Sequence, residues 1–161
     1  MHDVAPAPQH GLGLMATEEL GPRDCSIADA LSVLGERWTF LAIREMVYGS
    51  HRFEQIVGYT GVSRDILADR LRKLEEHGVV ERRQYSEHPP RYEYHLTQSG
   101  KELVPVLMSL AKWGHRWAAG STPGRSFLHE CGHVLDIDYR CASCGEPITA
   151  DSVDPVPVDA A

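Results

Sequence analysis

Residues 63–78 read SRDILADRLRKLEEHG, and this stretch decides the fold. Ser63 is a good helix N-cap and the final glycine is a good helix stop, so the residues between them are predicted to be helical. Leu67, Leu71 and Leu74 follow the i, i+4, i+7 spacing of one buried face. The other side has short side chains near its start and basic ones near its end. The stretch therefore predicts a helix with one face in a core and the other free for a partner.

Shorter helices are predicted upstream of this segment. Ser26 is expected to cap a first helix over residues 27–34. The next two are expected over about 36–48 and 53–57, followed by a turn over 58–61. The last of these helices and the 63–78 helix are then close enough in sequence to form a helix-turn-helix.

The segment after the helix reads VVERRQYSEHPPRYEYHL, residues 79–96. Two runs rich in β-branched and aromatic residues flank a Pro-Pro pair, which predicts a β-hairpin with a long tip. A long helix is expected from Thr97 to about Ala119, with Pro105 bending it. The order helix, helix, turn, helix, hairpin is that of a winged helix-turn-helix, a mainly α fold with a small β-hairpin wing (α+β).

The formal net charge of −7 is unevenly distributed along the chain. Residues 1–24 carry one basic and four acidic side chains (−3), and residues 121–161 carry two and seven (−5). Residues 51–96 carry eight of each (0), with a local excess of +2 at 64–73 (four and two) and again at 82–91 (three and one). Two basic clusters in an acidic chain fit contact with DNA better than the total charge suggests.

A helix fits the major groove of DNA, where base edges are distinguishable, and a hairpin tip can hold phosphate or enter the minor groove. The residues predicted to contact DNA on this basis are Ser63, Arg64, Asp65, Ala68, Asp69, Arg72, Lys73, Arg82, Arg83, His88 and Arg91. Two alternatives stay open from periodicity alone. One is a helical domain with ordinary solvated charges, and the other is a winged-helix protein-interaction module that does not bind DNA. The acidic total charge favours the second alternative slightly, whereas the arginines of the helix and hairpin favour DNA.

A longer ordered pattern supports DNA binding. It runs through CSIADALSVLGERWT, RFEQI, TGVS, LADRLRKLEEHGVVERR, PPRYEYHLTQSG and LVPVLMSLAKW, from Cys25 to Trp117. This stretch resembles the HxlR family of bacterial winged-helix transcription regulators. The resemblance implies a homodimer that binds double-stranded, palindromic operator DNA and has no catalytic activity. It also implies that the helix from Ser63 is the recognition helix, that Arg91 lies near the wing tip, and that the first and last helices form the dimer interface.

The last predicted helix has a coiled-coil-like apolar seam that is too apolar for a free surface. Together with the first helix, it supplies the predicted dimer contacts Ile27, Leu31, Leu103, Leu107, Leu110, Trp113 and Trp117. The alternative is that these side chains pack only within their own chain.

Cys25 lies just before the first predicted helix cap. A thiol there faces the positive end of the helix dipole, which raises its reactivity. In several HxlR-like regulators a cysteine at this place senses oxidants or electrophiles, so the resemblance implies a redox or electrophile sensor. No second cysteine is present in the winged domain, which leaves modification of Cys25 alone or a Cys25–Cys25 bond between subunits. The alternative is a small buried apolar side chain.

The segment from residue 121 to 152 is acidic and rich in cysteine and histidine. Cys141-Ala-Ser-Cys144-Gly has the spacing of a zinc knuckle, and Cys131-Gly resembles half of one. The segment is therefore expected to be a zinc-ribbon-like hairpin holding a structural Zn²⁺. The predicted ligands are Cys131, Cys141, Cys144 and His129, with His133 as the alternative fourth ligand. Free thiols or a Cys141–Cys144 redox pair are the alternatives to zinc.

The predicted organisation is a flexible arm (1–23), the winged domain with its dimer helices (24–120), the zinc-ribbon-like extension (121–152) and a disordered tail (153–161). No apolar run approaches the roughly 20 residues of a membrane span, and the first residues do not resemble a secretory signal. The cytoplasm is the expected compartment. No phosphate loop, GxSxG motif or paired-carboxylate motif suggests an enzyme.

Overall fold

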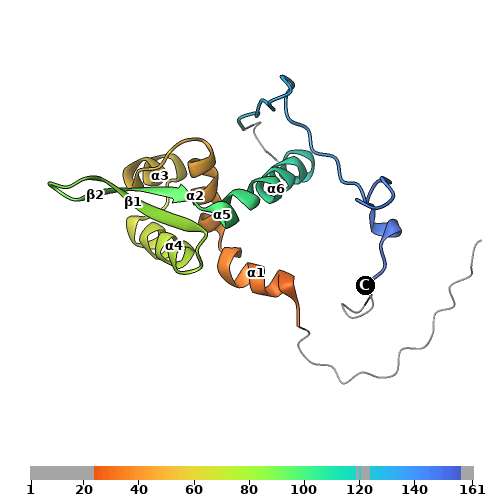
Figure 1. Ribbon diagram of the computed structural model, residues 1–161, viewed down its shortest axis with the longest axis horizontal. Coiled ribbons are helices and arrows are strands. Elements are labelled where there is room, and N and C mark those ends of the chain that lie inside the picture. Colours follow the sequence, from red (N-terminus) through yellow and green to blue (C-terminus); the bar gives the residue numbers. More distant parts are fainter. Residues whose placement is uncertain (1–23, 119, 121–123, 157–161) are drawn as a thin grey trace, which may run out of the picture.

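The computed structural model describes residues 24–118, 120 and 124–156 (Figure 1). The predicted arm over residues 1–23 and the last five residues of the predicted tail lie outside this part. The elements in chain order are α1 (Ser26–Leu34), α2 (Arg37–Val47), α3 (Phe53–Thr60), α4 (Arg64–Glu76), β1 (Val80–Ser86), β2 (Arg91–Leu96), α5 (Gln98–Glu102), α6 (Val104–Trp117) and the short 3₁₀ helix η1 (Ala150–Ser152).

The core lies between α2, α3 and α4, as the apolar spacing predicts. Leu67, Leu71 and Leu74 of α4 are at most 1% exposed, and they pack with the fully buried Ile43 of α2 and Ile56 of α3. Burying side chains of this size stabilises the fold by roughly 1.5–3 kcal/mol each. The prediction that the leucine face of the 63–78 segment is buried is confirmed, and this packing fixes which face of α4 is exposed.

The hairpin prediction is also confirmed. β1 and β2 pair antiparallel from Val80 opposite Leu96 to Arg83 opposite Glu93, with an irregularity between Gln84 and Ser86 near the tip. Val80 is buried at the base of the hairpin, whereas the tip projects away from the helices (Figure 1). The winged helix-turn-helix is therefore complete in the described chain.

Two predicted helix boundaries were wrong. Cys25, not Ser26, occupies the N-cap position of α1, and Ser26 is the first helical residue. The helix α3 continues through the predicted turn to Thr60, because its αL residue is Gly61 (φ 71°) rather than Gly58.

The long helix predicted from Thr97 to Ala119 is two helices that meet at Leu103. Pro105 lies in the first turn of α6. Proline has no amide hydrogen to continue an upstream helix but fits the start of a new one. The apolar periodicity runs across this break, which is why the spacing alone suggested a single helix.

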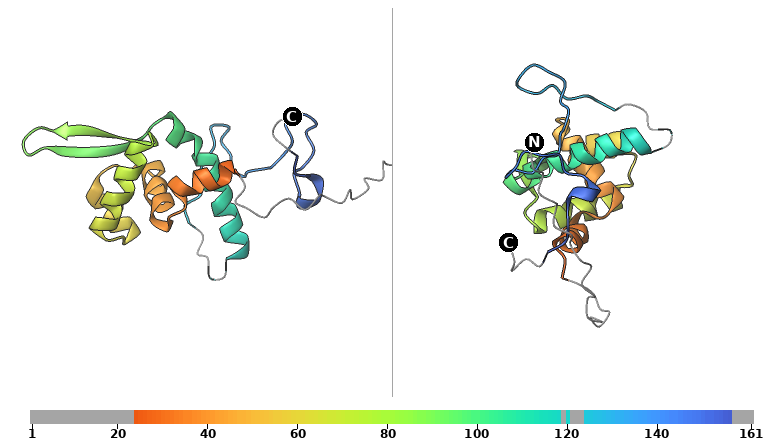
Figure 2. Two further views of the ribbon diagram at one scale, coloured as in Figure 1. Left: turned by 90° about the horizontal axis from the view of Figure 1, so that it is seen from below. Right: turned by 90° about the vertical axis from the view of Figure 1, so that its right-hand side faces the viewer.

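Helices α1 and α6 lie on the side of the winged domain away from the hairpin tip (Figure 1), and Figure 2 shows the same separation from a second direction. The chain after α6 forms two small turns rather than a hairpin of regular strands. In the described part of the chain, no helix is both long and apolar enough to span a bilayer.

Candidate nucleic-acid interface and C-terminal turns

The exposed side of α4 begins at a capped N-terminus. The Ser63 hydroxyl oxygen accepts a hydrogen bond from the Ile66 amide at 3.4 Å, and this cap starts the helix at Arg64. Arg64, Asp65 and Ala68 are exposed, as the helical spacing predicts. Small and polar side chains therefore stand on the N-terminal half of α4, the part that approaches base edges in helix-turn-helix proteins.

The arginines of α4 are held by neighbouring carboxylates. Arg64 makes a two-pronged contact with Glu54 of α3, at 2.5 and 2.6 Å. Arg72 donates to Asp69 at 2.6 Å and to Glu76 at 2.8 Å, and these hydrogen bonds raise the pKa of its guanidinium, with Asp69 as the largest cause. Exposed ion pairs are weak because water and salt screen them, so a competing anion can displace these carboxylates at low cost. Lys73 lies on the same helix and is half-buried.

The wing carries the second basic cluster. The Arg82 guanidinium lies 4.4 Å from the centre of the Tyr92 ring and 3.7 Å from a Glu75 carboxylate oxygen of α4. Arg83 is paired with Glu81 on the same strand. His88 and Arg91 are exposed at the tip. The predicted DNA-contacting residues thus come from α4 and the adjacent hairpin.

Arg52 belongs to this region, although sequence reasoning missed it. It precedes α3, pairs with Glu93 of β2 at 3.1 Å and lies 4.7 Å from the centre of the Tyr85 ring. The Arg52 hydrogen bond holds the pKa of Glu93 below its ordinary value. Arg52 therefore ties the wing to the helical unit. No local pattern could have identified it, because its partners lie more than 30 residues away in sequence.

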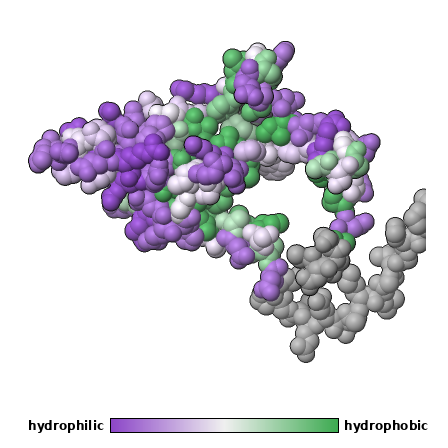
Figure 3. Space-filling model, in the orientation of Figure 1, coloured by the Kyte–Doolittle hydropathy of each residue, from purple (hydrophilic) through white to green (hydrophobic). Residues whose placement is uncertain are grey.

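The exposed apolar side chains lie away from this basic region. Ile27 and Leu31 of α1 are 68% and 56% exposed, and Leu110, Trp113 and Trp117 of α6 are 51%, 61% and 63% exposed. Hydrophilic residues dominate the hairpin and the adjacent helical surface in Figure 3, whereas green apolar residues concentrate nearer α6. The hairpin side of the winged domain is thus polar and carries both arginines and carboxylates, whereas the side with α1 and α6 leaves apolar helix surface uncovered.

Two of the predicted dimer contacts are covered within the chain itself. Leu107 is only 7% exposed, and Leu103 packs against the core. For these two residues the burial supports the alternative of packing within their own chain. Both lie close to the junction of α5 and α6 at Leu103, where α6 begins and packs against the core.

Cys25 is exposed at the N-cap position of α1. Within the described part of the chain its side chain is therefore not covered. Its backbone carbonyl accepts a hydrogen bond from the Asp29 amide at 3.1 Å, which places the cysteine at the helix end.

The C-terminal cysteines and histidines form two turns. In the first, an antiparallel bridge pairs Leu128 with Val134, and the Cys131 sulfur lies 3.7 Å from Nδ1 of His133. His129 Nδ1 instead accepts a hydrogen bond from the Cys131 amide at 3.3 Å. Gly132, directly after the cysteine, has the left-handed φ of 85° that the turn requires.

The second turn is closed by a bridge between Arg140 and Pro147. Hydrogen bonds from the amides of Cys144 and then Ser143 lower the pKa of the Cys141 thiol. Within residues 24–156, as far as they are described, no three potential metal ligands come together. The predicted hairpin that would join the two turns is therefore not formed in this structure, since the chain between them has no regular strands.

The sequence profile described as HxlR-like helix-turn-helix matches residues 33–122. An uncharacterized HTH-type transcriptional regulator of Mycobacterium bovis, Mb3122, is 40% identical over 134 residues, covering 82% of this chain and 85% of its own. This coverage is longer than residues 33–122, so the likeness continues outside the winged domain.

Solved structures show the same fold. PA1607, a putative transcription factor, is 30% identical with a TM-score of 0.71, and the match covers 82% of this chain and 94% of that one. The redox regulator HypR in its reduced form is 30% identical with a TM-score of 0.54, over 57% of this chain and 92% of its own.

Proposed function

The chain belongs to the HxlR-like helix-turn-helix family of transcription regulators, and from this premise we propose that it binds palindromic operator DNA as a homodimer through α4 and the β1–β2 wing. The observation that carries the proposal is the exposed face of α4 beside a hairpin with a local excess of positive charge over residues 82–91, on the opposite side of the helix from Leu67, Leu71 and Leu74.

The proposed binding geometry follows from that face. The N-terminal half of α4, from Ser63 to Asp69, enters the major groove, where side chains read base edges. Arg72 and Lys73 reach the phosphate backbone, and the wing residues Arg82, Arg83, His88 and Arg91 hold flanking phosphates or the minor groove. In the proposed complex a base edge replaces Glu54 as the partner of Arg64, and phosphates replace Asp69 and Glu76 as partners of Arg72. The phosphate contacts make binding strongly salt-dependent.

The proposed dimer uses the uncovered apolar surface of α1 and α6. Ile27, Leu31, Leu110, Trp113 and Trp117 are each more than half exposed. Covering such a surface with a second copy removes apolar area from water at about 25 cal/mol per Å². The surface lies away from the wing tip (Figure 1), so a dimer formed there leaves both wings free for DNA.

A gel shift tests the DNA-binding proposal. The full chain is titrated onto fragments from upstream of its own and neighbouring genes, with excess random-sequence competitor. Selective binding of one fragment that weakens as salt rises supports the proposal. Equal affinity for every fragment, or no binding at low salt, supports the protein-interaction alternative instead.

We propose that Cys25 is the redox-responsive residue. Its exposure at a helix N-cap supports this, as does the likeness to HypR, which is a redox regulator. Oxidants or quinones would modify its thiol and weaken DNA binding. A Cys25→Ser variant that keeps the full oxidant response in a gel shift contradicts the proposal.

We also propose that the C-terminal turns bind a structural zinc ion through Cys131, Cys141, Cys144 and one histidine. The support is local: each turn places a cysteine next to a glycine with positive φ, as a metal knuckle requires. Zinc binding would then draw the two turns together and supply folding free energy that this small segment lacks.

We propose that the protein acts in the cytoplasm and has no catalytic activity.

A further inference from the structure

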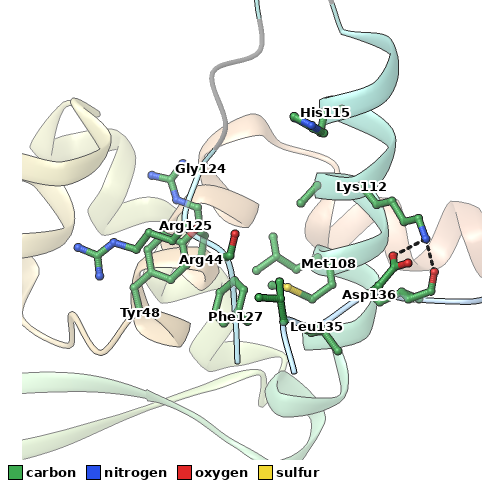
Figure 4. A pocket seen from close by; sticks show the side chains of 16 residues that line it. Arg44, Tyr48, Met108, Lys112, His115, Gly124, Arg125, Phe127, Leu135 and Asp136 are labelled. Carbon is green, nitrogen blue, oxygen red and sulfur yellow. Dashed lines mark hydrogen bonds and ion pairs between the residues drawn. The ribbon is translucent and has the colours of Figure 1, made fainter. Parts of the chain in front are cut away.

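A pocket of about 510 Å³ lies between α2, α6 and the C-terminal segment (Figure 4). This volume is within the range of roughly 300–1,000 Å³ typical of small-molecule sites. Its walls come from Arg44 and Tyr48 at the end of α2, from one side of α6 between Leu107 and His115, and from residues 124–127 and 134–137 of the C-terminal segment. The pocket lies outside the DNA-contacting surface described above, and the winged helix-turn-helix does not require it.

The first C-terminal turn closes the pocket. The Leu135 amide donates to the Phe127 carbonyl at 2.7 Å, which holds the two ends of the turn together. Lys112 of α6 then pairs with Asp136 at 2.6 Å and also donates to the Ile137 carbonyl. These contacts hold the first C-terminal turn against α6. The turn therefore forms a fixed wall of the pocket.

The interior of the pocket suits a flat apolar group. The rings of Tyr48 and Phe127 lie with centroids 5.5 Å apart, tilted by 34°. Met108 and Leu135 extend the apolar lining (Figure 4), and Leu107 also belongs to it. Aromatic rings prefer tilted or offset neighbours, and a methionine thioether adapts to a ring edge.

The charged groups at the pocket favour an anion. Its lining includes the cations Arg44, Lys112 and Arg125 but only one carboxylate, that of Asp136. Arg44 is already paired with Glu45, and Lys112 with Asp136.

Arg125 is the available cation. Its guanidinium lies 5.3 Å from the centre of the Tyr48 ring. Among the described residues, no carboxylate makes an ion pair with it. Figure 4 shows Arg44, Tyr48 and Arg125 on one side of the pocket and the Lys112–Asp136 pair on the other.

We propose that this pocket binds a small planar organic anion, an aromatic carboxylate. Its ring lies among Tyr48, Met108 and Phe127, and its carboxylate is held by Arg125. The ligand contacts α6 directly, and α6 also carries the exposed residues Trp113 and Trp117. The ligand site goes beyond the proposed DNA-binding function. Binding of the ligand can therefore be measured without DNA.

Isothermal titration calorimetry of the full chain with 2-naphthoate tests the site. The uncharged amide of the same ring, 2-naphthamide, is the matched ligand. We expect saturable binding of 2-naphthoate at one site per chain and at least about tenfold weaker binding of the amide, because the charge-assisted hydrogen bond is lost. Arg125→Gln should weaken 2-naphthoate about tenfold and leave the amide unchanged.

A second variant distinguishes ligand binding in this pocket from ligand binding on the exposed apolar face of α6. Ala111→Trp places a large side chain in the pocket wall, and it should abolish binding of both ligands while circular dichroism stays unchanged. Arg37→Gln removes one exposed positive charge outside the pocket and should leave binding unchanged. Non-saturable binding of 2-naphthoate, or equal binding by the wild type, Arg125→Gln and Ala111→Trp, overturns the proposal.

Discussion

Arg64 at the start of α4 is held by Glu54 of α3 through two hydrogen bonds of 2.5 and 2.6 Å. The pair joins the two helices of the helix-turn-helix across their exposed side, and both side chains are 64% exposed. Glu54 therefore positions Arg64 in the free protein, and in the proposed complex it would compete with DNA for this side chain.

Replacing the two members of this pair should have opposite effects on DNA affinity. Arg64→Ala should weaken operator binding by about 1–3 kcal/mol, the usual cost of losing an arginine at a base edge. Glu54→Gln should tighten binding about two- to fivefold, because an exposed pair contributes at most about 1 kcal/mol and a negative charge beside DNA is removed. Fluorescence anisotropy with a labelled operator measures both. Unchanged affinity for Arg64→Ala would remove α4 from the interface.

Arg91 at the wing tip should contact phosphate rather than base edges. It should therefore contribute to DNA affinity but not to sequence specificity. Arg91→Ala is expected to weaken specific and random DNA to the same extent and to reduce the slope of log K against log salt by about one. Lys101→Ala in α5 is the matched control, since it removes an exposed positive charge away from the wing. A loss of affinity confined to the specific site would mean that Arg91 reads bases.

Trp113 should be central to the dimer, because it is 61% exposed on the apolar row of α6. Trp113→Glu places a charge in the proposed interface and should convert the dimer to a monomer at micromolar concentration. Sedimentation velocity gives the mass, and circular dichroism checks the fold. A wild-type chain that sediments as a monomer contradicts the dimer proposal outright.

Purified full chain should contain one zinc ion, measured by elemental analysis. Cys144→Ser should lose it, whereas Cys25→Ser should retain it because Cys25 lies outside the proposed ligand set. Comparing His129→Ala with His133→Ala identifies the fourth ligand. Wild-type protein without zinc after purification in metal-replete buffer refutes the proposed site.

The Lys112–Asp136 pair makes docking of the first turn depend on pH. Lys112 holds the pKa of Asp136 below its ordinary value of 3.8, and Asp136 raises that of Lys112 above 10.5. The stabilisation is therefore present at neutral pH. It is lost as pH falls through the lowered Asp136 value and, at the other end, as pH rises through the raised Lys112 value.

Hydrogen exchange of the Leu135 amide reports this docking, since that amide is bonded within the turn. Asp136→Asn should reduce its protection factor at pH 7, and Asp151→Asn should not. Equal protection in the wild type and Asp136→Asn would show that the ion pair does not hold the turn.

Local sequence patterns predicted the features that depend on near neighbours. The spacing of Leu67, Leu71 and Leu74 located α4 and its buried face, and the Pro-Pro pair located the hairpin tip. The break at Leu103 was missed because apolar spacing continues across it. The turn glycines marked both C-terminal turns, but nothing local determines how the turns lie relative to each other.

The pocket and the Arg52–Glu93 pair were not predictable from the sequence. Tyr48, Met108 and Phe127 line one cavity although they lie up to 79 residues apart. Their proximity follows only once α6 has packed on the winged domain and the tail has folded back. Arg52 likewise meets Glu93 only through the packing of α3 against the hairpin.

The central claim is that α4 and the wing of a symmetric dimer read DNA. Selection of bound sequences from a random double-stranded library tests it most directly, with Arg64→Ala run in parallel. The account predicts an enriched palindrome with half-sites separated by about one helical turn, roughly 10–11 base pairs, or a multiple of it, and a changed or lost preference at one position of each half-site in the variant. A library that shows no enriched sequence with the wild-type protein would contradict it.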